Sequence, residues 1–201
     1  MTLLRRVAPV VSAVLAAGSL LVGCAHPAPL TLTGPKTDVV VTIPDGWHQV
    51  INTANPVIPE MVSPTTCSGA AEVSCALGLA RTATFAARSP EYAADIVRQS
   101  VIADRRITDT ADVSKGPGKI GVLDGYRYRF TFRNPQAILT CEVAAGLSGP
   151  DVPDVNGDRQ YSVILVWMSD KPGAPEVDMI DKIMDSVQLV AAQPRPAPPK
   201  K

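Results

Sequence analysis

An alternation of aromatic and charged side chains in the middle of the chain constrains its fold most. In the segment YRYRFTFR, residues 126–133, every second residue is aromatic, and three of the four residues between them are arginines. Successive side chains of a β-strand point to opposite faces of its sheet. The segment therefore predicts a strand with one face in a core and the other in solvent. The aromatic side chains predicted in the core are Tyr126, Tyr128, Phe130 and Phe132, and the arginines predicted in solvent are Arg127, Arg129 and Arg133.

Short apolar runs separated by turn residues predict further strands. The turns Pro44-Asp45-Gly46 and Asp124-Gly125 each predict a hairpin, because glycine in a short connection allows the chain to reverse. The last predicted strand is apolar on both faces, which indicates a central position in a sheet. The predicted strands, besides the aromatic one, cover residues 38–43, 47–51, 57–62 at a sheet edge, 76–87, 119–123, 137–147 and 161–169.

Two segments predict helices. Ser89 can cap a helix that begins at Pro90 and runs to about residue 105, since apolar residues recur there at helical spacing. A second helix is predicted from Pro175. Its inner face is predicted to carry Val177, Ile180, Met184 and Val187, and its outer face Asp178, Asp181, Lys182 and Asp185. Runs of strands interrupted by one helix and closed by another predict an α+β fold, an antiparallel sheet with two packed helices.

The N-terminus carries an export signal. Arg5 and Arg6 precede an apolar stretch, residues 7–21, which is shorter than the roughly 18 to 20 residues that span a bilayer. The sequence LVGC that ends at Cys24 resembles the lipobox of bacterial prolipoproteins. The resemblance implies that prolipoprotein-processing enzymes attach diacylglycerol to the sulfur of Cys24, cleave before it and add an N-acyl chain such as palmitate. The mature protein is therefore expected at the extracytoplasmic face of the cell membrane, held through the lipid on Cys24.

The chain is expected to have four parts. A signal peptide covers residues 1–23, a Pro-rich spacer 24–36, a single α+β domain 37–191 and a Pro-rich disordered tail 192–201. The tail either binds an anionic wall or a partner, or simply ends the domain, and we favour the latter.

Net charge and composition limit the classes of binding partner and indicate the source of the protein. Without Arg5 and Arg6 the 19 basic residues fall to 17 against 19 acidic ones, which gives the mature chain a net charge of −2. This balance offers no basic footprint for nucleic acid. The frequent Ala, Val, Pro and Arg residues are typical of an actinobacterial source.

Three cysteines remain besides Cys24. Disulfides persist outside the cytoplasm, so one bridge is expected among Cys67, Cys75 and Cys141, with one thiol left over. Cys67 and Cys75 are close together in a predicted loop, whereas Cys141 belongs to an apolar strand where it would be buried. We favour a bridge between Cys67 and Cys75, and the pairing of either with Cys141 is the open alternative.

No motif in the sequence predicts catalysis or a cofactor. The sequence GLSGP around Ser148 lacks the last glycine of a nucleophile elbow, and His48 is expected on the surface rather than as a general base. Calcium prefers oxygen ligands at alternating positions, and one loop holds Asp151, Asp154, Asn156 and Asp158. However, Arg159 stands where such a loop needs glycine. With His26 and His48 as the only histidines, a zinc site is not expected either.

The order of these elements resembles the Mog1/PsbP-like fold. The resemblance is carried by VVVTIPDGW in the opening hairpin, the mid-chain helix, the meander IGVLDGYRYRFTF and the closing helix that ends in DSVQLV. Together with the lipobox, this pattern is similar to that of the LpqN-type lipoproteins of mycobacteria over most of residues 38–190. The resemblance implies recognition rather than chemistry and brings no catalytic residues.

We therefore expect a lipid-anchored lipoprotein of the cell envelope that is not an enzyme. It would act as a binding or scaffold module for an unknown envelope or extracellular protein. The alternative is a carrier of a lipid or another small apolar ligand, held between the sheet and the helices. A large apolar cavity would favour the carrier, and a filled core would favour the binding module.

Overall fold

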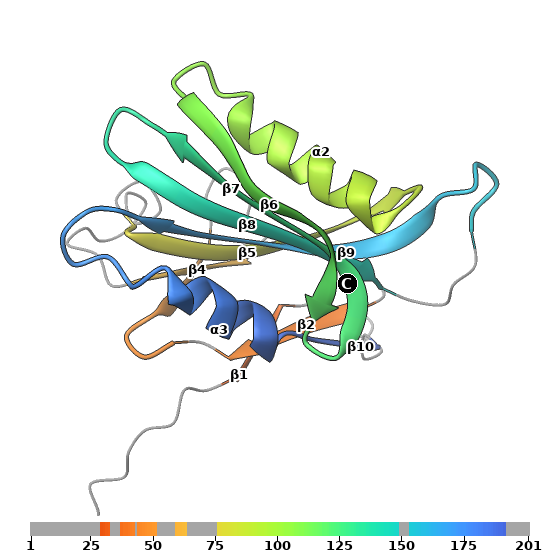
Figure 1. The fold of residues 1–201 in the computed structure, drawn as a ribbon. Coiled ribbons are helices and arrows are strands. Elements are labelled where there is room, and N and C mark those ends of the chain that lie inside the picture. Colours follow the sequence, from red (N-terminus) through yellow and green to blue (C-terminus); the bar gives the residue numbers. More distant parts are fainter. Residues whose placement is uncertain are drawn as a thin grey trace, which may run out of the picture.

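The computed structural model describes residues 29–32, 37–42, 44–51, 59–63, 76–148 and 153–191. The strands and helices in these ranges form two antiparallel sheets and two helices (Figure 1). The strands of the large sheet are β3 (His48–Ile51), β4 (Pro59–Val62), β5 (Gly78–Ala87), β6 (Thr108–Ile120), β7 (Leu123–Arg133), β8 (Ile138–Leu147) and β9 (Arg159–Ser169). The small sheet contains β1 (Pro29–Leu32), β2 (Thr37–Thr42) and β10 (Gln188–Ala191). The helices are α2 (Pro90–Ile102) and α3 (Asp178–Ser186).

The large sheet is covered by a helix on each face. Its strand order is β3-β4-β5-β9-β8-β7-β6, with α2 on one face and α3 on the other (Figure 1). β9 lies between β5 and β8 and is buried along nearly its whole length, as its sequence predicts. The predicted fold class, α+β with an antiparallel sheet and two packed helices, is therefore confirmed.

The core between the large sheet and α2 is aromatic. Phe130 is fully buried, and its ring centroid lies 6.0 Å from that of Tyr128 and 6.1 Å from that of Phe132. Ala93 and Ala94 are the fully buried residues of α2, and such small side chains let the helix lie close to the rings. The prediction that Tyr126, Tyr128, Phe130 and Phe132 point into a core is confirmed.

The small sheet and α3 close the opposite face. Val39 and Val41 of β2 pack with Ile180 and Ile183 of α3 in a second core cluster, which also contains residues of β5, β8 and β9. In the small sheet β2 lies between β1 and β10. Strand β1 falls within the segment that was expected to be a spacer.

Neither predicted hairpin turn joins its strands as expected. β2 and β3 follow one another across the turn at Asp45 and Gly46, but β2 pairs with β1 and β10 whereas β3 pairs with β4. The prediction of the first hairpin is therefore wrong. An alternating pattern predicts a strand but does not determine which strand it pairs with.

The hairpin of β6 and β7 does form, but its turn lies elsewhere. Ile120 pairs with Leu123, so the turn is Gly121-Val122 rather than Asp124-Gly125. Gly121 has a φ of 55°, and a Cβ atom there would lie 1.7 Å from the carbonyl oxygen of Val187. The hairpin tip meets the end of α3 so closely that this position requires glycine.

Both helices begin near their predicted positions. Ser89 caps α2 by accepting a hydrogen bond from the Tyr92 backbone N–H at 3.1 Å, and the helix ends at Ile102, before the predicted residue 105. α3 begins at Asp178, three residues after Pro175, and Val177 is 44% exposed, so its predicted place on the inner face is wrong. The other predicted inner residues are buried, and Ile183 joins them.

Two strands differ from their predictions. The strand predicted at a sheet edge forms as β4, but it lies between β3 and β5. β6 is far longer than predicted, and most of its side chains are exposed because it is the outer strand of the sheet. The Lys115–Lys119 part of this strand contains two glycines and a proline. These residues are unusual inside a strand, so the local sequence does not predict one there.

Candidate functional site

The cationic face of β7 lies largely under α3. Arg133 is exposed, and its Nε donates to Asp109 Oδ2 at 3.0 Å. The side chains of Arg127 and Arg129 are only 23% and 21% exposed. Their predicted position in solvent is wrong because α3 crosses this face and supplies Asp181, which accepts hydrogen bonds from both.

The Arg127–Arg129 cluster consists of these two arginines with Glu142 of β8 and Asp181 of α3. Arg129 donates through Nε to Glu142 Oε2 and through Nη2 to Asp181 Oδ1, both at 2.6 Å. Arg127 donates to Glu142 and, at 3.0 Å, to Asp181. Burial opposes the charge of Arg129, but its hydrogen bonds with Asp181 and Glu142 outweigh this and raise its pKa.

The cluster fastens α3 to the sheet. The side chain of Glu142 is 3% exposed, and a carboxylate so deeply buried is stable only when it is paired and hydrogen-bonded. A polar hollow of about 370 Å³ lies between the cluster and the Ser114–Gly118 part of β6. An anion entering this hollow would compete with Glu142 and Asp181 for the same guanidinium groups, which makes it a poor anion site.

A second polar link joins α2 to the sheet on the aromatic face. The Tyr128 hydroxyl donates to Asp112 Oδ2 at 2.7 Å, and Arg98 of α2 pairs with Asp112 Oδ1 at the same distance. The Arg98 guanidinium lies 4.9 Å from the Tyr128 ring centroid. Burial and the hydrogen bond to Asp112 raise the pKa of Tyr128 to about 12, and the Tyr128 hydrogen bond lowers the pKa of Asp112.

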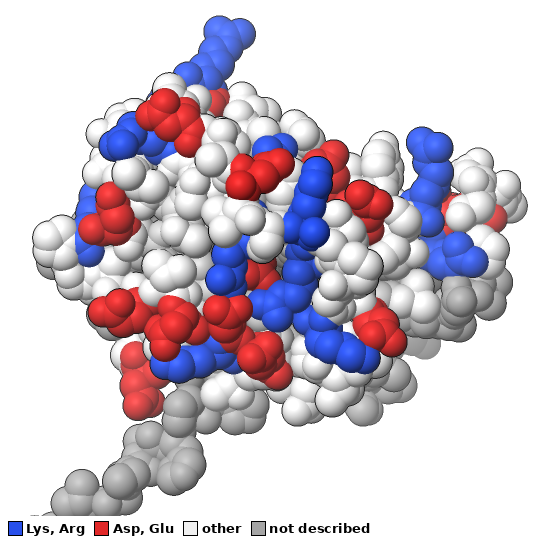
Figure 2. Space-filling view, viewed as in Figure 1, with Lys and Arg blue, Asp and Glu red and all other residues white. Residues whose placement is uncertain are grey.

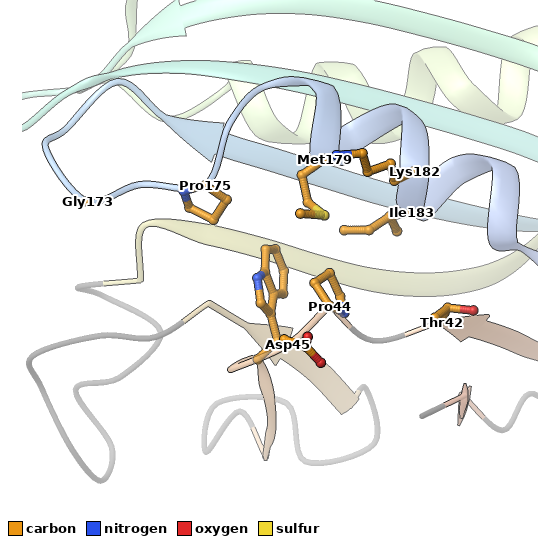
Figure 3. A pocket seen from close by; sticks show the side chains of 9 residues that line it. Thr42, Pro44, Asp45, Gly173, Pro175, Met179, Lys182 and Ile183 are labelled. Atoms are coloured by element: carbon orange, nitrogen blue, oxygen red, sulfur yellow. The ribbon is translucent and has the colours of Figure 1, made fainter. Parts of the chain in front are cut away.

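The candidate binding site is an apolar hollow between the turn after β2 and the start of α3, which we call the Trp47 hollow. Its volume is about 450 Å³. Figure 3 shows Met179 and Ile183 of α3 pointing toward Pro44 of the turn, with Pro175 at one end. The apolar residues that line it are Pro44, Trp47, Pro175, Met179 and Ile183, and the other lining residues are Thr42, Asp45, Gly173 and Lys182.

Trp47 is held in place by the turn and by the sheet beneath it. Its backbone N–H donates to the Pro44 carbonyl at 3.1 Å. A Cβ atom on Gly78 would lie 3.0 Å from the Trp47 ring and 2.8 Å from the sulfur of Met168, so the indole packs directly over the glycine. The Ser63 hydroxyl accepts from the Gly78 backbone N–H at 2.8 Å and fixes this part of β5. The wall of the hollow is therefore preformed.

The charged residues that line the hollow carry opposite signs. Asp45 is exposed, and Lys182 pairs with Asp178 one helical turn away at 2.8 Å. Lys182 keeps 63% of its side chain exposed. The hollow thus has an apolar interior and is bordered by the exposed pair of Lys182 and Asp178. This arrangement suits an apolar ligand with a polar end.

The other predicted residues divide between the described and the undescribed parts of the chain. Cys24, Cys67, Cys75, His26 and Asp151 lie outside the described residues. Cys141 is a buried free thiol on β8, and its burial raises its pKa well above the usual value.

Other loop and strand-end residues take structural positions. His48 is exposed at the start of β3. Asp154 accepts from the backbone N–H groups of Asn156 and Asp158, at 2.8 and 3.0 Å, and so closes a turn. Ser148 is buried at the end of β8.

The sequence held weak signals for the two sites. Glu142 is the single charged residue in the predicted apolar strand 137–147, and such a residue needs a partner. Trp47 follows a Pro-Asp-Gly turn, but the hollow combines this turn with a helix more than 130 residues later in the chain. No local pattern could have brought these segments together.

Comparisons with known proteins leave the family of the chain open. No protein-family model matches it, and no curated protein matches it. A crystal structure of a protein from Bacteroides thetaiotaomicron is similar over 75% of this chain, with 10% identity and a TM-score of 0.41. The chain covers 44% of that protein. The resemblance to LpqN-type lipoproteins and to the Mog1/PsbP-like fold stays a prediction.

Neither of the two described helices is long and apolar enough to cross a bilayer. Among the described residues, no group of three or more His, Cys, Asp or Glu side chains is placed to hold a metal ion.

Proposed function

We propose that this chain is a non-catalytic binding module of the cell envelope, anchored at the outer face of the membrane through a lipid on Cys24. The observation that carries the proposal is the sequence LVGC after a basic and apolar N-terminus. Two or three acyl chains would give the stable anchoring that one chain cannot. The pattern of the elements supports a relation to LpqN-type lipoproteins, and the partner would be an envelope or extracellular protein.

The environment of the reactive groups supports a binding role. The Cys141 thiol is fully buried with a raised pKa, so little of the nucleophilic thiolate forms near neutral pH. Glu142 and the two arginines beside it are engaged with one another and with Asp181. These groups hold elements together, which leaves surfaces and hollows as the means of recognition.

The anchor is tested by replacing the lipid-accepting residue in the full chain. The Cys24→Ser variant lacks the thiol that accepts diacylglycerol, so it should accumulate as a precursor longer by the signal peptide. The matched control is Cys67→Ser, which keeps Cys24 and should be processed normally. Immunoblots of membrane fractions compare the sizes. Processing of Cys24→Ser to the wild-type size would contradict the proposal.

A carrier of a small apolar ligand is the second candidate, and the Trp47 hollow favours it. Its volume of about 450 Å³ falls in the range of ligand sites. Most of the space between the sheet and the helices is occupied by the two buried clusters. The hollow that remains between α2 and strands β5 and β9 has a volume of about 260 Å³, which is below the usual range of ligand sites and favours the binding module. Lipid extraction of the purified protein separates the two: a carrier retains one lipid per molecule after transfer to lipid-free buffer, and the binding module retains none.

A further inference from the structure

The Trp47 hollow lies beside the point where the chain enters the fold. β1 begins at Pro29, five residues after Cys24. An extended chain spans at most about 3.3 to 3.6 Å per residue, so Pro29 stays within roughly 18 Å of Cys24. Pro29 pairs with Thr42 of β2, and Thr42 lines the hollow. Paired strands lie about 4.8 Å apart, so a lipid on Cys24 keeps the hollow close to the bilayer surface.

The end of the molecule that carries the tether is distinct from the aromatic core. Figure 1 shows β1 and α3 on the same side of the large sheet, opposite α2. With Cys24 at the level of the lipid headgroups, the few residues between Cys24 and β1 would keep this side of the domain closer to the membrane than α2.

The lining of the hollow matches a lipid acyl chain. Pro175, Met179 and Ile183 offer it apolar surface, and the Trp47 ring adds an aromatic wall. Trp47 is only 8% exposed, so its ring belongs to the wall of the hollow rather than to the outer surface of the domain. The ammonium group of Lys182 pairs with Asp178 at 2.8 Å, so this side chain offers the hollow its apolar stem while its charge stays in solvent.

We propose that the Trp47 hollow docks the domain on the bilayer by accepting an acyl chain of a membrane phospholipid. The inference rests on the proposed attachment of a lipid to Cys24. It identifies the Trp47 hollow as the surface that this attachment brings to the membrane. Figure 2 shows acidic side chains gathered over α3. These carboxylates repel anionic headgroups, so the hollow prefers zwitterionic phospholipids.

The chain offers its own spectroscopic control, because it contains two tryptophans on opposite faces of the large sheet. Trp47 packs in the cluster with α3, whereas Trp167 of β9 packs against the cluster on the α2 face. Trp167→Phe leaves Trp47 as the sole indole emitter, and Trp47→Phe leaves Trp167. Both lipidated full-length variants are placed in phosphatidylcholine vesicles with brominated or ordinary acyl chains, since bromine quenches a nearby indole.

The expected result is that brominated vesicles quench more than half of the Trp47 emission and leave the Trp167 emission nearly unchanged. In the Trp167→Phe background, Met179→Gln places an amide in the hollow and should reduce the quenching at least twofold. The matched change Ile96→Gln, on the exposed surface of α2, should leave it unaltered. Circular dichroism confirms that each variant is folded.

The outcomes separate this inference from the anchor. Protein that floats with the vesicles and carries an acylated Cys24, but shows no quenching of Trp47, overturns the docking and leaves the anchor intact. Equal quenching of Trp47 and Trp167 also overturns it. Protein that carries no acyl group on Cys24 overturns the proposed function and the docking with it. Anionic vesicles that quench more strongly than zwitterionic ones contradict the stated lipid preference.

Discussion

At the scale of single residues, Glu142 explains why two arginines of an alternating strand leave solvent. Its carboxylate is buried on β8 and accepts from Arg127 and Arg129, while Asp181 completes the pairing from α3. Once one carboxylate is buried, its cations must be close and correctly oriented. Arg127 and Arg129 therefore attach α3 to the large sheet.

The Glu142→Gln variant should be strongly destabilised. An amide removes the negative charge but leaves two arginines that are about four-fifths buried, with Asp181 as the carboxylate they still share. Removing one member of a buried pair costs about 3 kcal/mol or more. Urea unfolding at pH 7 measures the loss. The control is Asp124→Asn, which breaks an exposed pair with Lys119 and should cost less than about 1 kcal/mol. Equal effects of the two changes would refute this assignment.

Tyr128 should make the stability of the domain fall at high pH. Burial and the hydrogen bond to Asp112 raise its pKa from 10.0 to about 12. The folded state thus retains a proton that the unfolded state loses, and the contribution to stability is complete below pH 10 and is lost as the pH rises to about 12. Chemical unfolding between pH 9 and pH 12 follows this loss.

The Tyr128→Phe variant is the control for this titration. It lacks the ionisable hydroxyl, so its stability should fall less steeply across the same interval. A decline remains, because burial also raises the pKa of Tyr126 and of the Cys141 thiol. If the free energy of unfolding falls equally steeply with pH in the variant and in the wild-type protein, ionisation of Tyr128 does not cause the loss of stability at high pH.

At the scale of elements, the β6–β7 hairpin is positioned by the contact of its turn with the end of α3. The Gly121 backbone N–H donates to the Met184 carbonyl at 3.3 Å, and no side chain fits at this position. The hairpin, α3 and β10 therefore meet at one point, and β10 continues directly into the small sheet.

Gly121→Ala should disturb this junction. The new methyl group would overlap the Val187 carbonyl, and the positive φ adds strain, so the cost should be about 3 kcal/mol. Gly157→Ala is the matched control, since Gly157 also has a positive φ but its added methyl group would meet no described atom within 4 Å. Its cost should be about 1 kcal/mol. Thermal unfolding compares the two, and a cost for Gly121→Ala no larger than for Gly157→Ala would contradict the contact.

Much of the element content could be predicted from the sequence, whereas the pairing of elements could not. The cap at Ser89, the aromatic face of β7 and the central position of β9 depend on local patterns. The separation of β2 from β3 and the burial of Arg127 under α3 depend on segments far apart in the chain. The Trp47 hollow belongs to the second kind, because a turn and a distant helix form it together.

At the scale of the whole molecule, the two faces of the large sheet have different tasks. The α2 face carries the aromatic core and a smaller hollow beside β5 and β9, while the α3 face holds the ion cluster, the small sheet and the Trp47 hollow. The proposed lipid would join the chain on the side of the hollow. Recognition and attachment would then share one side of the domain.

The exported domain should contain one disulfide, between Cys67 and Cys75. Cys141 is buried with a raised pKa, so iodoacetamide should label no thiol in the native mature protein apart from any unmodified Cys24. In denaturant without reductant, peptide mapping should find the label at Cys141. Labelling of Cys67 or Cys75 instead would show that the bridge reaches Cys141, and labelling of all three would exclude a bridge.

The lipid anchor is tested most sharply by the intact mass of the wild-type protein extracted from membranes. We expect a chain that begins at Cys24, without residues 1–23, and that is heavier than its sequence by a diacylglyceryl group, with or without a further N-acyl chain. Tandem mass spectrometry of the N-terminal peptide should place this mass on Cys24. A mature chain that begins at another residue, or a Cys24 without acyl mass, would contradict the proposed anchor.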